Sequence, residues 1–222
     1  MWKHNKVFWL GYAFFIAGSL MILLFIDKGD EILYINKQRT PVADLFFIYT
    51  TRLGEAYILI PALLLLLFYQ FRYAFTVPLL GLTILFASAV PKQLFAHPRP
   101  YLYFKENRLL DQIQFVEGVT MNGGRTSFPS GHTITAFAVF AFLAFCLPNK
   151  RGTAVALLLV AILVGISRIY LVMHFLEDVV FGSLIGVALA VLWYKVQFQL
   201  FKPHNRLFDK KLTINNKKQA GA

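Results

Sequence analysis

The chain has 222 residues, of which 58% are hydrophobic and 15% charged, and its mean hydropathy is +0.60. This composition indicates an integral membrane protein of a single domain, and the lone cysteine, Cys146, excludes an intramolecular disulfide. A net charge of +11 could indicate nucleic-acid binding. The cations lie in tails, short loops and polar islands instead of on one helix face, which favours a membrane surface and phosphate ligands.

Six apolar runs predict transmembrane helices, because about 20 apolar residues cross a ~30 Å hydrocarbon core. They are Val7–Ile26, Ala56–Phe71, Tyr73–Val90, Thr133–Leu147, Gly152–Ile166 and Val179–Tyr194. The first run lacks the short apolar core and small residues of a cleaved signal peptide, so we expect an uncleaved span. Only Arg72 separates the second run from the third, and we expect a tight turn there at a membrane surface.

Two polar segments interrupt these runs. In Asp27–Gly54, the helical spacing of apolar positions in Phe46–Leu53 predicts a helix in the membrane interface, acting as a linker and a cover for the bundle. The long segment Pro91–Pro129 contains glycines and aromatic residues that favour a loop in contact with substrate. We therefore predict an all-α membrane protein with six transmembrane helices, an interfacial helix and a long loop between spans three and four.

This membrane domain is predicted to cover residues 1–200, and residues 201–222 are predicted to form a basic, disordered tail close to anionic lipid. The predicted connection after span four is Pro148–Arg151. Six spans place both termini on one side of the membrane and all three polar islands on the other. Lysine and arginine are slightly more numerous on the side of the termini, which predicts cytoplasmic termini and an outward-facing site in a bacterial inner membrane.

The most polar of these islands, Ser167–Asp178, lies between two long apolar runs. Charged residues are costly in such surroundings and mark a functional site by default. The run from Gly152 to Val196 has no proline and is too long for one crossing, so the chain must turn at this island. If His174 opens the next helix, Asp178 lies one turn later on the same face and can accept a hydrogen bond from one imidazole nitrogen, leaving the other free.

Three permanent cations occur in the islands, namely Lys92, Arg99 and Arg168. The island Pro129–His132 adds a hydroxyl, a glycine at a predicted helix N-terminus and a second histidine. Arginine forks bind phosphate oxygens in pairs, lysine supplies a point charge, and free N–H groups at a helix start complete an anion site. A tetrahedral dianion is therefore the predicted ligand.

Together the three islands resemble the type 2 phosphatidic acid phosphatases, the PAP2 family, whose site is related to those of bacterial acid phosphatases and vanadium haloperoxidases. The family pattern is a lysine, six residues and Arg-Pro, then Pro-Ser-Gly-His, then Ser-Arg, five residues, His, three residues and Asp. It matches Lys92–Pro100, Pro129–His132 and Ser167–Asp178 in order. Pro-Ser-Gly-His alone is a weak signal, whereas the three blocks at these spacings are a strong one. The predicted six-span layout also resembles the family's membrane branch.

The resemblance implies a reaction that uses no metal and no other cofactor. His174 would attack phosphorus and form a phosphohistidine, while Asp178 would hold its tautomer. His132 would protonate the leaving alkoxide and later activate water. The groups that would bind the phosphate oxygens are Lys92, Arg99, Ser130, the Gly131 N–H and Arg168.

Other residues near the motifs have more than one interpretation. Arg125, Tyr101 and Lys105 could contact a lipid headgroup or serve as ordinary interface anchors. His97 lies inside the first motif, and we interpret it as a structural residue.

Two alternatives concern the histidine partners. Glu177 is three residues from His174 and could also reach it, although the family pattern places the partner at Asp178. A zinc or non-haem iron site built from His132, His174 and Asp178 is possible in principle. The neighbouring cations would repel a divalent metal, which disfavours that interpretation.

The predicted function is hydrolysis of the phosphate monoester or diphosphate of a lipid, whose chains stay in the bilayer while the headgroup enters the site. Candidate substrates are undecaprenyl diphosphate, phosphatidylglycerophosphate, phosphatidic acid and lipid A. The alternatives are a lipid phosphotransferase that uses the same phosphohistidine and a non-catalytic transporter or lipid-phosphate-binding protein. The expected partners are the phosphorylated lipid and membrane lipids, with no nucleic acid and no obligate protein partner.

Overall fold

The computed structural model describes residues 5–147, 151–201 and 207–213, in which every regular element is helical. The predicted all-α class is therefore confirmed for the described part of the chain. The elements are α1 (Lys6–Phe25), α2 (Asp30–Asn36), α3 (Pro41–Arg52), η1 (Ala56–Ile58), α4 (Leu59–Leu67), α5 (Phe71–Phe95), α6 (Pro100–Glu106), η2 (Leu110–Gln112), α7 (Gly131–Cys146), α8 (Arg151–Tyr170) and α9 (Leu176–Leu200).

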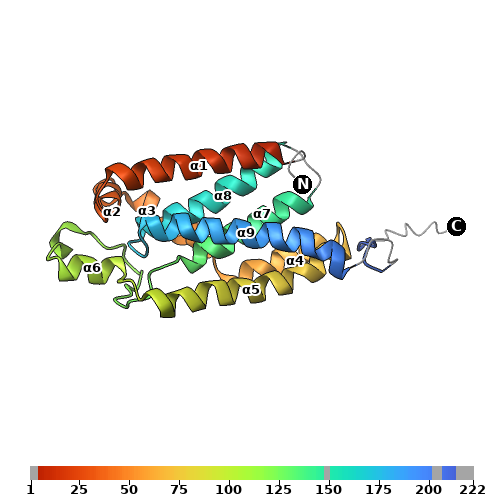
Figure 1. Ribbon diagram of the computed structural model, residues 1–222. Helices are drawn as coiled ribbons and strands as arrows, with labels where there is room; N and C mark the ends of the chain where they lie inside the picture. Colours follow the sequence, from red (N-terminus) through yellow and green to blue (C-terminus); the bar gives the residue numbers. More distant parts are fainter. Residues whose placement is uncertain (1–4, 148–150, 202–206, 214–222) are drawn as a thin grey trace.

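The long helices lie side by side with similar axes, and the short helices α2, α3 and α6 lie at one end of the bundle (Figure 1). That end holds α2, α3, α6, the end of α5 and the turn from α8 to α9. The start of α1 and the end of α9 lie at the opposite end. The helix connections that carry polar islands thus lie toward one end, as the parity of the predicted spans requires.

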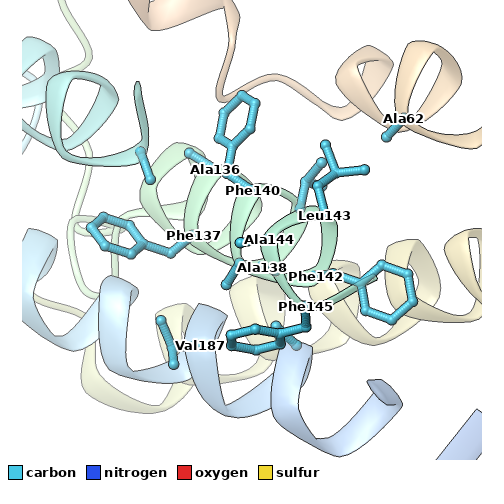
Figure 2. Close-up of a cluster of buried hydrophobic side chains, with 14 of the residues drawn as sticks. Ala62, Ala136, Phe137, Ala138, Phe140, Phe142, Leu143, Ala144, Phe145 and Val187 are labelled. Atoms are coloured by element: carbon cyan, nitrogen blue, oxygen red, sulfur yellow. The ribbon is translucent and has the colours of Figure 1, made fainter. Parts of the chain in front are cut away.

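Helix α7 occupies the centre of the bundle. It is apolar on every side, which is the pattern of a fully buried helix, and all its residues from Thr133 to Cys146 are buried. Its phenylalanines point in different directions into the surrounding helices, with Val187 of α9 and Ala62 of α4 among their neighbours (Figure 2). Protein therefore encloses α7 from Thr133 to Cys146, whereas Gly131 and His132 at its start are only partly buried.

Two glycines bring α9 close to α7. A Cβ on Gly182 would lie 2.9 Å from the carbonyl oxygen of Ser130, and a Cβ on Gly186 would lie 2.6 Å from that of Ile134. Small residues four apart allow membrane helices to approach closely, and Asp178 lies one further turn along the same face. This register lets the Ser130 N–H donate to the Asp178 carbonyl at 3.1 Å, joining two predicted site residues through their backbones.

Four described helical segments are long and apolar enough to cross a membrane, namely Lys6–Phe25, Phe71–Glu106, Arg151–Tyr170 and Leu176–Leu200. A fifth would be the pair Pro41–Arg52 and Ala56–Leu67, which is bent by 63°. Helix α7 has 16 residues, about 24 Å of helix, and falls short of a ~30 Å core. Its central place shields it from lipid, and the predicted count of six spans stays a prediction.

The predicted interfacial segment forms α3. Thr40 caps this helix by accepting from the Ala43 N–H at 3.2 Å, and its outer face exposes apolar side chains such as Val42 and Leu45. Its inner face packs on α8, where Tyr170 donates to Asp44 at 2.6 Å. The sequence therefore predicted a helix here correctly, and its place in a membrane interface stays a prediction.

Two predicted boundaries were wrong. The tight turn between α4 and α5 comprises residues 68–70, so Arg72 lies in the first turn of α5, where it pairs with Asp209. The loop predicted from Pro91 begins only at Ala96, which adopts left-handed backbone at φ 46°. Proline is tolerated inside membrane helices, and α5 continues through Pro91 to Phe95. Lys92 is consequently held on a helix and not on a loop.

Part of the predicted tail is described. The carbonyl oxygens of Lys210 and Phe208 accept hydrogen bonds from the backbone N–H groups of Phe71 and Arg72 at 2.9 and 3.1 Å, which satisfies free donors at the start of α5. Residues 202–206 and 214–222 of the predicted tail lie outside the described residues, as does most of the predicted connection at 148–150.

Candidate active site

The turn between α8 and α9, residues 171–175, carries His174. The backbone N–H groups of Met173 and His174 donate to the Arg168 carbonyl at 2.9 and 3.2 Å, and Val172 adopts left-handed backbone at φ 57°. His174 therefore precedes α9, whereas the sequence suggested that it opens this helix. The turn closes on the end of α8 and directs the imidazole inward, where it is only 2% exposed.

Asp178 lies in the first turn of α9 and is fully buried. Its Oδ2 accepts from the Phe175 N–H at 3.0 Å and from Ser127 Oγ at 2.6 Å, and it lies 3.3 Å from Nδ1 of His174. A carboxylate only accepts, so this contact places the imidazole proton on Nδ1 and leaves the lone pair on Nε2. The expected contact between the two side chains is present.

Burial lowers the pKa of His174 from 6.5 to about 4, because the charged imidazolium loses its hydration. The hydrogen bond to Asp178 opposes this change, while the positive charges of Arg168 and Arg99 add to it. The imidazole is therefore neutral at pH 7 and carries a free lone pair.

Both predicted arginines lie next to this turn. Arg168, at the end of α8, is 7% exposed and donates from Nη1 to Thr51 Oγ1 at 2.6 Å. Arg99, which precedes α6, donates from Nη1 to the Met173 carbonyl at 3.3 Å and from Nε to Thr126 Oγ1 at 3.4 Å. Each guanidinium is thus held by one or two neutral acceptors, which leaves several N–H donors for an anion.

The start of α7 meets Lys92 on α5. Ser130 caps α7, and its Oγ accepts from the N–H of Thr133 at 3.4 Å and from the Thr133 hydroxyl at 2.9 Å. A Cβ on Gly131 would lie 2.7 Å from Ser88 Oγ and 3.4 Å from Nζ of Lys92. Glycine therefore permits the ammonium group to approach the N-terminus of α7, a favourable place for an anion.

His132 completes the cluster. It interacts electrostatically with Arg168, His174, Lys92 and Arg99, so the three sequence islands converge on one place. A cavity of about 350 Å³ opens beside it between α4, α5 and α7. Its lining combines polar and apolar residues, namely Gly54, Glu55, Ala56, Leu59, Gly81, Ile84, Leu85, Ser88, Lys92, Gly131, His132 and Thr135.

The three predicted headgroup residues lie on or near α6, at the edge of the site. Arg125 pairs with Glu106 at 2.7 Å, and both side chains are about half exposed. Tyr101 on α6 packs against the ring of Phe115 at an angle of 50°, and Lys105 is exposed. The structure does not bring these three side chains into contact with the central cluster, and their contact with a headgroup stays a prediction.

The remaining candidates have structural contacts. His97 packs against the rings of Phe95 and Phe128, and its carbonyl accepts a hydrogen bond from the loop, in keeping with the structural interpretation. Glu177 pairs with Lys28 at 2.5 Å on the outer side of α9 and does not serve His174. Within the described residues, no group of three or more histidine, cysteine, aspartate and glutamate side chains is placed to hold a metal ion.

Sequence reasoning missed several residues of this site. Ser127 donates to Asp178, and its position just before the Pro-Ser-Gly-His motif was the only signal available. Thr51 lies in the last turn of α3, Gly54 and Glu55 lie between α3 and α4, and Ser88 lies on α5. None of these four lies in a recognisable motif, so only the packing of the helices identifies them.

Fold and site together define a helical membrane protein with a buried histidine–aspartate pair inside a cationic cluster. The model of the PAP2 superfamily matches residues 62–202 of the chain. This chain belongs to that superfamily, and the resemblance found from the three motifs is confirmed.

Several curated relatives are lipid phosphatases by name. Phosphatidylglycerophosphatase B of Bacillus subtilis is 33% identical over 104 residues, which cover 40% of this chain and 51% of that protein. Lipid phosphate phosphatase 2 of Arabidopsis thaliana is 34% identical over 135 residues, covering 50% of this chain and 45% of that protein. The lipid A 4'-phosphatase of Bacteroides thetaiotaomicron is 34% identical over 95 residues, with 43% and 41% covered. The chain thus spans about half the length of these relatives.

The similarity to solved structures covers a larger share of the chain. LpxE of Aquifex aeolicus has a TM-score of 0.64 and 30% identity, with 77% of this chain and 96% of that chain covered. A transmembrane PAP2-type phosphatidylglycerolphosphate phosphatase of Bacillus subtilis has a TM-score of 0.62 and 24% identity, with 93% and 100% covered. The second likeness supports the fold alone. With the apolar helices, these neighbours support an integral membrane protein.

Proposed function

We propose that this protein is a membrane-embedded lipid phosphatase that acts through a phosphohistidine on His174. The observation that carries this proposal is the buried His174–Asp178 pair, whose 3.3 Å contact leaves Nε2 free as a nucleophile. Further support comes from the relatives named as lipid phosphatases and from the neighbouring cations, which match a phosphate dianion.

In the first step, Nε2 of His174 attacks phosphorus, and the bond from phosphorus to the ester oxygen breaks on the opposite side. The bonding electrons stay on that oxygen, and His132 donates the proton that makes it an alcohol. Asp178 keeps the proton on Nδ1 and stabilises the positive charge that develops on the ring.

In the second step, water attacks the phosphohistidine and gives up a proton to His132. The nitrogen–phosphorus bond breaks, inorganic phosphate leaves, and both histidines return to their starting states. Charge on the phosphoryl oxygens grows in both transition states, and catalysis then depends mainly on stabilising it. The groups assigned to this task are Lys92, Arg99, Ser130, the Gly131 N–H and Arg168.

A lipid substrate follows from the location of the site in a membrane bundle. The cavity beside His132 has apolar walls from α4 and α5, and these walls suit the start of a hydrocarbon chain. Phosphatidic acid, phosphatidylglycerophosphate, undecaprenyl diphosphate and lipid A are the candidate substrates. We propose a bacterial inner membrane as its location, and the distribution of lysine and arginine favours a site that faces outward and termini in the cytoplasm.

Phosphate release by detergent-solubilised protein from these four lipids tests the proposal, with His174→Ala assayed beside the native chain. We expect release from at least one lipid, and a loss of roughly 10³-fold or more in the variant, because the nucleophile is absent. Binding of the lipid should survive. Full activity in His174→Ala would contradict the mechanism, and transfer of labelled phosphate to an added alcohol would indicate a phosphotransferase.

A further inference from the structure

The end of α3 and the segment that follows it, residues 51–55, form a wall of the site, although they belong to none of the three motifs. Thr51 accepts a hydrogen bond from Arg168 at 2.6 Å. A Cβ on Gly54 would lie 2.8 Å from the carbonyl oxygen of His132 and 2.9 Å from its Cβ. The sharp bend between α3 and α4 is therefore packed directly on two residues of the catalytic cluster.

Glu55 brings a carboxylate to this wall. It lines the cavity of about 350 Å³ that Lys92, Gly131 and His132 also line, and its charge attracts the guanidinium of Arg168. A carboxylate beside a site for phosphate repels negative charge on whatever enters. An acidic residue in this place therefore favours ligands whose nearest part is neutral over ligands whose nearest part is negatively charged.

In the proposed mechanism, the part of the substrate that faces Glu55 is the leaving group. In-line attack by His174 expels this group on the opposite side, where His132 protonates it, and the cavity lies beside His132. Apolar residues from α4 and α5 line the same cavity, for example Leu59 and Ile84. A neutral alcohol that continues into a hydrocarbon chain matches both parts of this lining.

The leaving group of a lipid diphosphate is different. When the terminal phosphoryl group moves to His174, the bond from its phosphorus to the bridging oxygen breaks, and a lipid monophosphate with its own negative charge departs into the cavity. Lys92 is the permanent cation among the lining residues, and the proposed mechanism commits it to the transferred phosphoryl group. The departing phosphate would therefore face Glu55 without a cation of its own.

We propose that Glu55 is a specificity-determining residue that makes this protein selective for lipid phosphate monoesters over lipid diphosphates. The inference deepens the proposed phosphatase function and rests on it. It names the substrate class by chemistry, namely a phosphate esterified to a neutral alcohol with an apolar chain.

Phosphatidic acid and diacylglycerol pyrophosphate with the same acyl chains test this selectivity, because they differ only in the leaving group. The initial rates of loss of each lipid, separated by chromatography, give kcat/KM. We expect the native chain to prefer phosphatidic acid by roughly tenfold or more, and Glu55→Gln to reduce this preference by roughly tenfold, mainly through faster cleavage of the diphosphate. Glu55→Asp, which keeps the charge, should retain most of the preference.

Glu117→Gln is the matched control, since it removes the same charge from an exposed position in the loop after η2 and should leave the preference unchanged. An equal loss on both lipids in Glu55→Gln would overturn the proposal and assign Glu55 only to the placement of Arg168. A native preference for the diphosphate would also overturn it. Release from none of the lipids by the native chain would instead overturn the phosphatase function itself.

Discussion

Helices α7 and α5 are both apolar and both carry site residues near one end, yet the protein encloses only one of them. Every residue of α7 from Thr133 to Cys146 is buried. The buried residues of α5 all lie between Arg72 and Ile84, and its second half exposes large apolar side chains such as Phe86. Overall hydropathy does not separate the two helices, because lipid and a protein interior are equally apolar solvents.

The α7–α9 side and the α5 side of the site therefore differ in how tightly they are packed and in what they contribute. The α7–α9 side is packed backbone to backbone at Gly182 and Gly186, and it holds the histidines and Asp178 in fixed positions. The α5 side carries Lys92 and borders the open cavity beside His132. The residues to which we assign the chemistry are thus on the tightly packed pair, and the cavity that we propose for the lipid is on the looser side.

The largest effect should come from the inward face of α9. Asp178→Asn would present an amide N–H to Nδ1 of His174, favouring the tautomer that blocks Nε2, and we expect phosphate release to fall by about 10³-fold or more. The neighbouring Glu177→Gln removes a charge from the outer face and should change the rate by less than about twofold, as exposed ion pairs contribute little. Similar losses in the two variants, at similar thermal stability, would contradict this division.

Next in size is the contact between α7 and α9. Gly186→Ala would place a Cβ 2.6 Å from the Ile134 carbonyl and 2.9 Å from the Ala138 nitrogen, and backbone atoms cannot move aside separately. We expect destabilisation of about 1–3 kcal/mol, which lowers the Tm in detergent by roughly 3–10 °C. Gly18→Ala on α1 has no atom within 4 Å of the new Cβ and should be neutral or slightly stabilising. A rise in Tm in both variants would refute the close-packing argument.

The sequence predicted much of this site because its chemistry is local. Lys92, Arg99, His132 and Arg168 were identified from motif spacing, and the partner of His174 from a separation of four residues. Charged residues in apolar sequence are costly and therefore conspicuous. The helical class also followed from local sequence, because long apolar runs are typical of membrane helices.

The other features of the site depend on how the helices pack, which the spacing of residues in the sequence does not predict. Thr51, Gly54 and Glu55 reach the site because α3 and α4 bend beside α7, and a surface segment with mixed polarity gives no sign of that. The predicted end of α5 was wrong because proline is typical of a loop, whereas α5 continues through Pro91 to Phe95. The sequence did not predict that α7 lies at the centre of the bundle, since hydropathy does not distinguish a lipid-facing helix from an enclosed one.

The smallest expected effect is a dependence on pH of the stability that the buried His174 contributes. With the pKa of His174 lowered to about 4 from 6.5, the unfolded chain binds a proton between these values and the folded chain does not. The stability contributed by the neutral imidazole is therefore complete above pH 6.5 and is lost as pH falls towards 4. Between pH 7 and pH 5 the loss should be about 2 kcal/mol, and it should be absent from His174→Gln.

Two measurements check this expectation. Thermal unfolding of the native chain and of His174→Gln between pH 7 and pH 5 gives the difference in stability, which should grow in favour of the variant as the pH falls. An NMR titration of labelled histidine gives the pKa directly, with the His174 signal identified by its absence from His174→Gln. A signal that titrates near pH 6.5 would show that the imidazole is hydrated and not enclosed between α8 and α9. The contrast with the open α5 side would then not hold at His174, the proposed nucleophile.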